Sequence, residues 1–416
     1  MTKPRSSSSF GVLGWVRRRI LPKASKLCAL LGLLILGAWV TGRVLTDQYQ
    51  WSQYLWWIPP IWMIGSAWGL LLMSAALALF ARRLGGIFLR PVLLIACIGS
   101  TGYLILGVWH MHRVVLPKSI PDDAIRIAHW NQAAKKIDQE SFGQWILDEQ
   151  IDIALIANAR WGKDRQILLD ALAGYAPLDR ERWVNYSYRI KGKPSHFWIQ
   201  SQALIASRYP MIRTGRVAFG SAKREQVLTH SSSGLGWVMF IEFDLGNDAK
   251  ISSDEPDPLV VWFVDLPSSP STFRQKMMRQ ARQAIEQWDG SGWEIGPHVW
   301  EQKTFISKPF PDPDLIIGDF NTLRSSDSLK RIAPDMRDAF EMVGYGRGRS
   351  WIPGNKNRLA RLPIKLADWH IDLSLVGKDW QTTRYRIENG SDWGSTEHRI
   401  QIVDVAEKVP ESIPFP

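Results

Sequence analysis

The pattern of hydrophobic and polar positions divides this chain into an apolar N-terminal part and a longer part of alternating short elements. Residues 27–45, about 54–80 and 91–109 are apolar runs without a single acidic residue. At about 1.5 Å of rise per helical residue, roughly 20 such residues cross a hydrocarbon layer of about 30 Å. The runs predict three transmembrane helices. Three buried helices of a soluble domain are the alternative, which leaves acid-free runs of this length unexplained.

Aromatic and basic residues give these spans a direction. If the runs alternate in direction, six aromatic residues fall near one membrane interface: Trp39, Trp51, Tyr54, Trp56, Trp57 and Trp109. Residues 1–26 hold seven Lys or Arg and no acid, and the loop between the second and third runs adds three more. Because basic loops stay in the cytoplasm, we expect a multi-pass protein of the cell (inner) membrane with a cytoplasmic N-terminus and an extracytoplasmic C-terminal part. Two further spans after the first disfavour a cleaved signal peptide.

The remainder of the chain reads as strands and helices in turn. Apolar runs bounded by turn residues predict strands at 124–131, 151–157, 201–207, 226–229, 237–243, 259–265, 314–319, 369–376, 381–387 and 399–405. Helical spacing predicts helices at 140–150, 164–172, 271–288 and 326–331, and 289–314 reads as irregular. The helix at 271–288 is amphipathic, and we expect its apolar face to pack inward rather than dock on a membrane.

These elements give a plan of five segments. We expect a basic cytoplasmic leader at 1–26, the membrane region at 27–110, a linker at 111–121, one folded domain at 122–408 and a tail at 409–416.

Charge and cysteine usage exclude several classes of function for the folded domain. The chain carries a formal charge of +11, but residues 1–120 hold +12 of it, so the remainder is close to neutral. The basic pI is therefore no sign of a broad nucleic-acid-binding face. A local patch remains open, against a merely solvated loop: Arg347, Arg349, Lys356, Arg358, Arg361 and Lys365. Only Cys28 and Cys97 exist, both in predicted spans, which excludes disulfides, cysteine nucleophiles and zinc–cysteine sites.

Polar residues stand where the predicted strands end. They are Asn131, Asn158, Asp265, Asp319 with Asn321, Asp372, and the pair Glu397–His398. A lone Gly-Asp-x-Asn most often caps a turn. Gathered together, carboxylates would hold a hard cation such as Mg²⁺, amides would donate to phosphoryl oxygens, and a histidine beside a carboxylate would move a proton.

The order of these motifs resembles the endonuclease/exonuclease/phosphatase superfamily over about residues 122–408. The most specific motif is Gly318-Asp319-Phe320-Asn321, and Trp130-Asn131, Asn158, Ser207-Arg208, Ile371-Asp372 and Thr396-Glu397-His398 follow the family's order. The resemblance implies an α/β (α+β) fold, a four-layer sandwich of two packed mixed sheets with outer helices. It also implies hydrolysis of phosphate esters with Mg²⁺ or Mn²⁺, on substrates such as DNA, phosphoinositides or sphingomyelin.

Carried over to this chain, the resemblance implies a role for each motif residue. Asn131 would position the metal or phosphate, Asp319 would orient or activate the attacking water, and Asn321 would stabilise phosphoryl oxygens. Asp372 would be a further acidic, metal-binding member. His398 would act as acid–base or phosphate contact, oriented by Glu397, where the family usually has Asp.

Two departures from the family bear on the metal. The family's principal metal-ligand Glu is replaced by Asn158, and its catalytic His by Asp265. We expect Asp265 to restore the lost charge, with Asn158 as an amide ligand. The leading hypothesis is a membrane-anchored, extracytoplasmic Mg²⁺-dependent hydrolase of a lipid head group, a small phosphoester or nucleic acid. The alternative is a catalytically impaired binding or scaffold module of the same fold.

Overall fold

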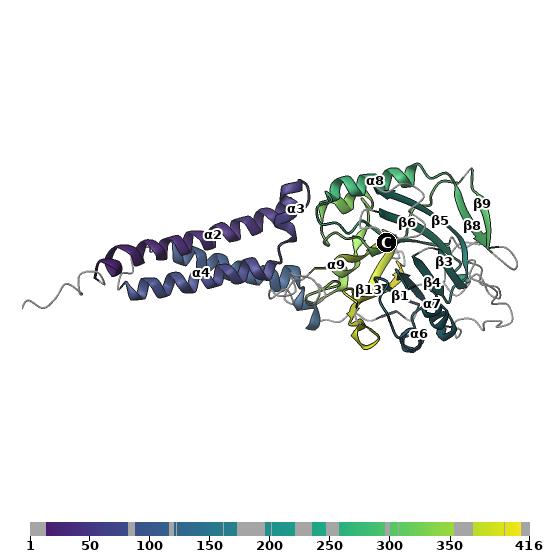
Figure 1. The fold of residues 1–416 in the computed structure, drawn as a ribbon, viewed down its shortest axis with the longest axis horizontal. Coiled ribbons are helices and arrows are strands. Elements are labelled where there is room, and N and C mark those ends of the chain that lie inside the picture. The colour runs from purple at the N-terminus through teal and green to yellow at the C-terminus, as the bar shows by residue number, and fades with distance from the viewer. Residues whose placement is uncertain are drawn as a thin grey trace, which may run out of the picture. The chain divides into compact units, whose positions relative to one another are not determined.

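The computed structural model divides the chain into two compact units, which separate between Met111 and His112 (Figure 1). It describes residues 14–81, 88–115, 120–121, 123–160, 162–172, 196–200, 202–220, 235–246, 258–295, 300–306, 308–352, 369–394 and 396–408. Three sequence expectations lie outside these residues: the strand at 226–229, the tail at 409–416, and the basic residues Lys356, Arg358, Arg361 and Lys365.

The N-terminal unit contains three helices long and apolar enough to cross a membrane, as the hydrophobic runs predict: Val16–Leu45, Pro60–Phe80 and Leu89–Val108. They comprise α2 (Leu21–Leu45) after a π-helical turn, α4 (Pro60–Phe80), and α5 (Leu89–Tyr103) continued by a second π-helical turn. Ser25 and Ser74 join α2 to α4, each hydroxyl donating to the other's carbonyl oxygen at 2.8 Å. Small polar residues satisfied in this way are typical of helix contacts within membranes.

The second span begins later than the sequence indicated. Tyr54, Trp56 and Trp57 belong to a separate helix, α3 (Gln50–Trp57), and Ile58 is extended. The residue before a proline is driven out of the helical region, and Pro59 and Pro60 follow in succession. The expected span at 54–80 is therefore wrong at its start, because the apolar run continues across a break that the two prolines impose.

The C-terminal unit is built on two mixed sheets. The first has the order β13-β14-β1-β2-β4-β3, with β1 and β2 parallel and the other neighbours antiparallel. Its strands are β1 (Ile125–Asn131), β2 (Ile153–Ala157), β3 (Phe197–Gln200), β4 (Ala203–Ser207), β13 (Trp380–Glu388) and β14 (Ile400–Glu407).

The second sheet has the order β11-β12-β10-β7-β6-β5-β8-β9, with β10 and β7 parallel. Its strands are β5 (Met211–Gly220), β6 (Leu235–Phe243), β7 (Leu259–Asp265), β8 (Ser291–Ile295), β9 (Trp300–Thr304), β10 (Leu315–Asp319), β11 (Arg337–Asp338) and β12 (Asp372–Val376). Apolar side chains of both sheets interdigitate to form the largest buried cluster.

Helices cover the outer faces of the sheets. On the first sheet, α6 (Gln139–Asp148) and α7 (Lys163–Ala171) bury their apolar residues against β1, β2 and β4. On the second, α8 (Arg274–Glu286) lies across β5 and β6 and buries Met277, Ala281 and Ile285 (Figure 1). Shorter elements include α9 (Ala339–Val343) and a 3₁₀ turn at Asp327–Arg331. The result is the four-layer sandwich that the sequence predicted, with the apolar face of α8 turned inward.

Two features of the second sheet escaped the sequence pattern. Strand β5 was not expected because Arg213 and Arg216 interrupt its apolar residues, although Arg213 is buried in an ion pair with Glu242 of β6. The segment 289–314, expected to be irregular, contains the hairpin of β8 and β9. Alternation there is obscured by Gly292, Glu294 and the charges of β9, since an edge hairpin has little apolar surface to bury.

Gly318 explains the glycine of the Gly-Asp-Phe-Asn motif. It lies in the middle strand β10 with a φ of +153°, and a Cβ at this position would stand 2.0 Å from the carbonyl oxygen of Val264. No side chain fits so close a backbone approach. The glycine therefore lets β10 and β7 run side by side, which brings Asp319 and Asp265 level with each other.

Candidate active site

Strand register places three carboxylates in one row at the edge of the second sheet. Asp319 is paired with Asp372 of β12 on one side and with Asp265 of β7 on the other. Laterally paired residues point to the same face of a sheet. That face is turned toward the first sheet, because Asn131 at the end of β1 donates from Nδ2 to Asp319 Oδ2 at 3.0 Å. Residues spread over the whole domain sequence thus meet between the sheets.

Two amides link the carboxylates into a hydrogen-bonded chain. Asn158, just after β2, donates from Nδ2 to Asn131 Oδ1 at 3.1 Å and to Asp265 Oδ2 at 3.0 Å. Because Asn131 in turn donates to Asp319, the order along the chain is Asp265, Asn158, Asn131, Asp319. The two positions that depart from the family motifs are therefore direct partners within one site.

The orientation of the Asn158 amide follows from its neighbours. Asn131 Oδ1 and Asp265 Oδ2 are both acceptors, so the NH₂ group of Asn158 must face them. The Oδ1 of Asn158 is left buried without a hydrogen-bond partner among the described residues. Such an acceptor costs about 1–3 kcal/mol if nothing satisfies it. The residue has a φ of +54°, which asparagine tolerates better than most residues. This oxygen is the kind of group that a hard cation would satisfy.

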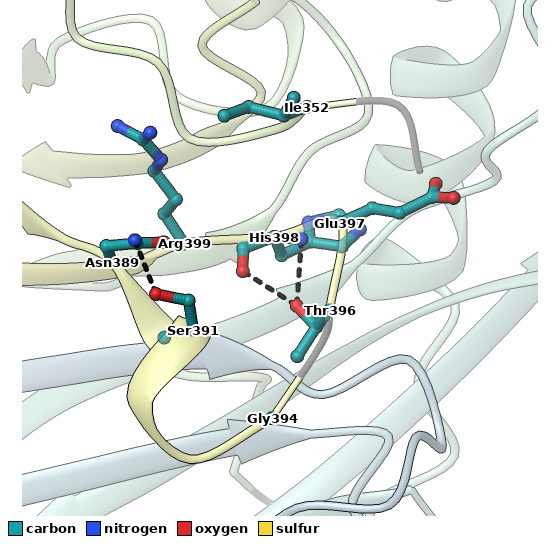
Figure 2. Close-up of a pocket in the computed structure, with 9 residues that line it drawn as sticks. Ile352, Asn389, Ser391, Gly394, Thr396, Glu397, His398 and Arg399 are labelled. Atoms are coloured by element: carbon teal, nitrogen blue, oxygen red, sulfur yellow. Dashed lines mark hydrogen bonds between the residues drawn. The ribbon is translucent and has the colours of Figure 1, made fainter. Parts of the chain in front are cut away.

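His398 lies between two of the carboxylates. Its Nδ1 is 3.1 Å from Asp372 Oδ2, and its Nε2 is 3.8 Å from Asp319 Oδ2. The backbone of His398 is also held: Thr396 Oγ1 accepts from its N–H at 2.9 Å and donates to its carbonyl at 2.7 Å (Figure 2). Trp130 Nε1 donates to the same carbonyl. The imidazole is thus fixed with one nitrogen on Asp372 and the other toward Asp319.

The expectation that Glu397 orients His398 is corrected by this geometry. The carboxylate on the His398 ring is that of Asp372, and among the described residues the Glu397 side chain makes no hydrogen bond. Figure 2 shows the Glu397 carboxylate extending away from the other labelled side chains.

Asn321 serves Asp319 from within the same motif. Its backbone N–H donates to Asp319 Oδ1 at 2.9 Å, and its side-chain Nδ2 donates to the carbonyl of Leu266 at 2.7 Å. A φ of +47° turns the chain sharply enough for this bond. Asn321 therefore fixes the Asp319 carboxylate, and its amide makes no other hydrogen bond with the described residues.

Burial and mutual repulsion shift the titration of these groups. Burial, reinforced by the charge of Asp372, raises the pKa of Asp319 to about 8. Burial likewise raises the pKa of Asp265 to about 6. For His398 burial lowers the pKa, but Asp372 and Asp319 outweigh it and raise the pKa to about 9. Burial also works to raise the pKa of Asp372, yet the charge and hydrogen bond of His398 lower it overall. An ionised Asp372–His398 pair follows.

Sequence reasoning missed the polar groups behind this pair. Ser350 Oγ accepts from the N–H groups of Ile371 and Asp372, at 2.9 Å each. Gln401 Nε2 lies 3.0 Å from His129 Nδ1, which is itself 3.9 Å from Asp372 Oδ1. Burial lowers the pKa of His129 to about 4, so it is neutral. The sequence feature that could have indicated these groups is the position of His129, two residues before Asn131 and therefore on the same face of β1.

A cavity of about 230 Å³ opens beside His398 (Figure 2). Residues of the connection between β13 and β14 line most of it, among them Asn389, Ser391, Thr396, Glu397 and Arg399. His398 is itself among the lining residues, so the cavity gives a bound molecule access to this residue.

The donor atoms present fit a divalent cation. Atoms of Asp319, Asp372 and His398 lie within 4.8 Å of one another. Asp265 is not part of this group, and a role of Asp265 and of the Asn158 oxygen as ligands stays a prediction. Oxygen donors of this kind suit a hard cation such as Mg²⁺ or Mn²⁺.

No protein-family model and no curated protein sequence matches the chain. Among solved structures, an endonuclease/exonuclease/phosphatase from Bacteroides vulgatus is similar at 15% identity and a TM-score of 0.41, over 68% of this chain and 99% of that one. A mannosyl-6-phosphatase from Bacteroides thetaiotaomicron matches at 10% identity and 0.42, over 68% and 99%. D. rerio TDP2 complexed with single-strand DNA product matches at 13% and 0.41, over 68% and 100%. Structures of the family that the motifs resemble are thus among the matches.

We predict that Asp265→Ala abolishes Mg²⁺ binding, because it removes a carboxylate and releases the Asn158 amide from its place. Isothermal titration calorimetry on the full chain in detergent measures this. The matched control is Asp327→Ala, which removes a carboxylate bonded to Gln275 on the other side of the sheet. A binding isotherm for Asp265→Ala equal to that of the wild type, in a variant that unfolds at the wild-type temperature, would remove Asp265 from the cation site.

Proposed function

We propose that this chain is a membrane-anchored, extracytoplasmic phosphoester hydrolase that depends on a divalent cation. The observation that carries the proposal is the chain of Asp265, Asn158, Asn131 and Asp319, set beside the Asp372–His398 pair. This arrangement offers acidic ligands, amide donors and a fixed imidazole at strand ends that meet between the two sheets. Hydrolysis of a phosphate ester uses all three.

Asp319 is positioned to act on the attacking water. Its two carboxylate oxygens are held by Asn131 and by the N–H of Asn321, so the carboxylate has one orientation. When bound, the cation supplies charge that polarises the phosphoryl oxygens and favours the ionised form of Asp319. An ionised, fixed carboxylate can then accept a proton from water.

His398 is positioned to donate a proton or a hydrogen bond. Its Nδ1 is engaged by Asp372, which leaves Nε2 facing the site. With its pKa raised by the neighbouring carboxylates to about 9, the imidazole is protonated at neutral pH. It can therefore stabilise negative charge on a phosphoryl oxygen or protonate the departing oxygen.

Amide hydrogens complete the phosphoryl site. The Asn131 amide uses one N–H on Asp319, and the Asn321 amide uses one on Leu266, so each has a second N–H to offer. Donors fixed in advance stabilise developing charge without reorganisation. The proposed substrates are phosphate esters near a bilayer, either a lipid head group or a small exported ester, with nucleic acid disfavoured by the near-neutral charge after residue 120.

A second candidate function is a binding module that keeps the fold without turnover. Asn158 favours it, because an amide ligand lacks the charge of a glutamate and holds a hard cation more weakly. The two candidates share the same site and differ in whether Asp319 has a well-held cation beside it.

Hydrolysis by the Asp319→Asn variant separates these candidates. We predict metal-dependent hydrolysis of bis(p-nitrophenyl) phosphate or p-nitrophenyl phosphate by the wild-type chain, and a loss of at least about 10²-fold in Asp319→Asn. The substitution keeps the size of the side chain and removes its charge. Asp335→Asn makes the same change at an exposed carboxylate and should keep the wild-type rate. No metal-dependent rate, or equal rates in wild type and Asp319→Asn, would favour the binding module.

The orientation in the membrane can be tested with an introduced thiol. Cys28 and Cys97, the chain's own cysteines, both lie within apolar helices. Lys330 is exposed, so Lys330→Cys should react in intact cells with a maleimide that does not cross membranes, while the wild type gives the background. Labelling that appears only after lysis would place the folded unit in the cytoplasm.

A further inference from the structure

Arg216 of β5 lies on the face of the second sheet that carries the candidate site. Strand register pairs Arg216 with Met239 and the next residue on the same face, Ala218, with Trp237. Trp237 is in turn paired with Asp265. Arg216 therefore belongs to the inner face and starts one row below the carboxylates, two strands away from Asp265. Arg216 belongs to none of the sequence motifs and has no role in the chemistry proposed above.

Trp237 provides a platform for the Arg216 side chain. The guanidinium carbon of Arg216 stands 4.8 Å from the centre of the Trp237 ring. The ring is buried, and its Nε1 donates to Gln202 Oε1 at 3.3 Å. A guanidinium stacked on a fixed aromatic face keeps its in-plane N–H groups available for other partners.

Two of the three guanidinium nitrogens have no hydrogen-bond partner among the described residues. Nε and Nη1 of Arg216 are buried and make no hydrogen bond there, and no described carboxylate lies within 4.0 Å of the guanidinium. Arg213, three residues earlier on the same strand, shows the usual arrangement, since its Nε donates to Glu242 Oε2 at 2.9 Å. A buried charge is normally paired, because desolvation is expensive. The two arginines of β5 thus have different roles.

The charged group that affects the pKa of Arg216 is Asp265, which belongs to the candidate site. Burial lowers the pKa of Arg216 to about 10, and the negative charge of Asp265 works in the opposite direction. Arg216 is therefore charged at neutral pH. A positive group here stands on the Asp265 side of the carboxylate row, opposite the side on which Asp372 holds His398.

We infer that Arg216 is a substrate-binding residue, which donates a charge-assisted hydrogen bond from Nε to an oxygen atom of a phosphate group. This inference rests on the proposed function, since it assigns the anion that the site would act on. Hydrogen bonds from a guanidinium to a phosphate oxygen are short and strong. Arg216 would give the row of carboxylates a fixed cationic donor for an anionic substrate. The phosphate group of the substrate would then lie on the side of the site formed by β5 and β6.

Binding of inorganic phosphate tests the inference without turnover. The full chain in detergent, with Mg²⁺, is titrated with phosphate by calorimetry, and thermal unfolding is recorded with and without phosphate. Charge-assisted hydrogen bonds of this kind correspond to about a tenfold to hundredfold change in affinity. We expect Arg216→Met to weaken phosphate binding by that factor and to lose the phosphate-induced rise in unfolding temperature. Arg216→Lys, which keeps the charge without the guanidinium N–H groups, should fall between.

The control is Arg282→Met on α8, where the arginine is exposed and paired with Glu286, and it should bind phosphate as the wild type does. Wild-type affinity in a folded Arg216→Met, or no phosphate binding by the wild-type chain, would overturn the inference. If Arg216→Met does not fold, the same comparison is made with Arg216→Lys, and wild-type affinity there overturns it.

Kinetics keep this inference distinct from the proposed function. If the wild type hydrolyses phosphate esters, Arg216→Met should raise KM by the same tenfold to hundredfold factor while kcat falls less. Hydrolysis with an unchanged KM and unchanged phosphate affinity would contradict the role of Arg216 and leave the proposed function standing. Phosphate binding that depends on Arg216, without any hydrolysis, would do the reverse.

Discussion

Three carboxylates forced side by side in a buried edge set the terms for the rest of the site. The register of β7, β10 and β12 places Asp265, Asp319 and Asp372 side by side, and Gly318 permits the close approach of β10 to β7. Charges of one sign repel strongly when they are out of water. The fold answers with an imidazolium on Asp372, amide donors on Asp265 and Asp319, and a backbone N–H on Asp319.

These hydrogen bonds leave part of the repulsion between the carboxylates, and one buried oxygen, without compensation. The raised pKa values of Asp319 and Asp265 show that protonation competes with the carboxylate form, and the Asn158 oxygen lacks a partner among the described residues. A divalent cation would satisfy both conditions at once. In our proposal the acidic ligand that the family carries after β2 has moved across the hydrogen bond from Asn158 to Asp265, so that the site keeps its charge while the residues exchange roles.

The strand-end residues of this site could be predicted because each strand appears in the sequence as an apolar run that stops at a polar residue. Apolar runs that stop at Asn131, Asp265 or Asp319 marked positions that the register then brought together. The pairing of His398 could not be read in the same way. Its partner depends on which of two acids, Glu397 or Asp372, faces the imidazole, and only the fold places Asp372 there.

Outside the site, the elements that the sequence did not predict also have local explanations. Charged residues interrupt the apolar pattern of β5, and β8 and β9 form an edge hairpin with little apolar surface. Two prolines divide an apolar run that composition alone makes continuous. Arg216 gives no signal in the sequence that separates it from Arg213, since both sit among apolar residues of one strand. Only the contacts show that Arg213 is paired and that the buried N–H groups of Arg216 face none of the described acceptors.

Anomalous diffraction from crystals of the full chain grown with Mn²⁺ tests most directly whether a cation binds at the row of carboxylates. We predict an anomalous peak in contact with a carboxylate oxygen of Asp319, with Asp265 and the Asn158 oxygen around it. Crystals that show Mn²⁺ only at exposed acidic residues, with Asp319 free of metal at saturating Mn²⁺, would contradict it.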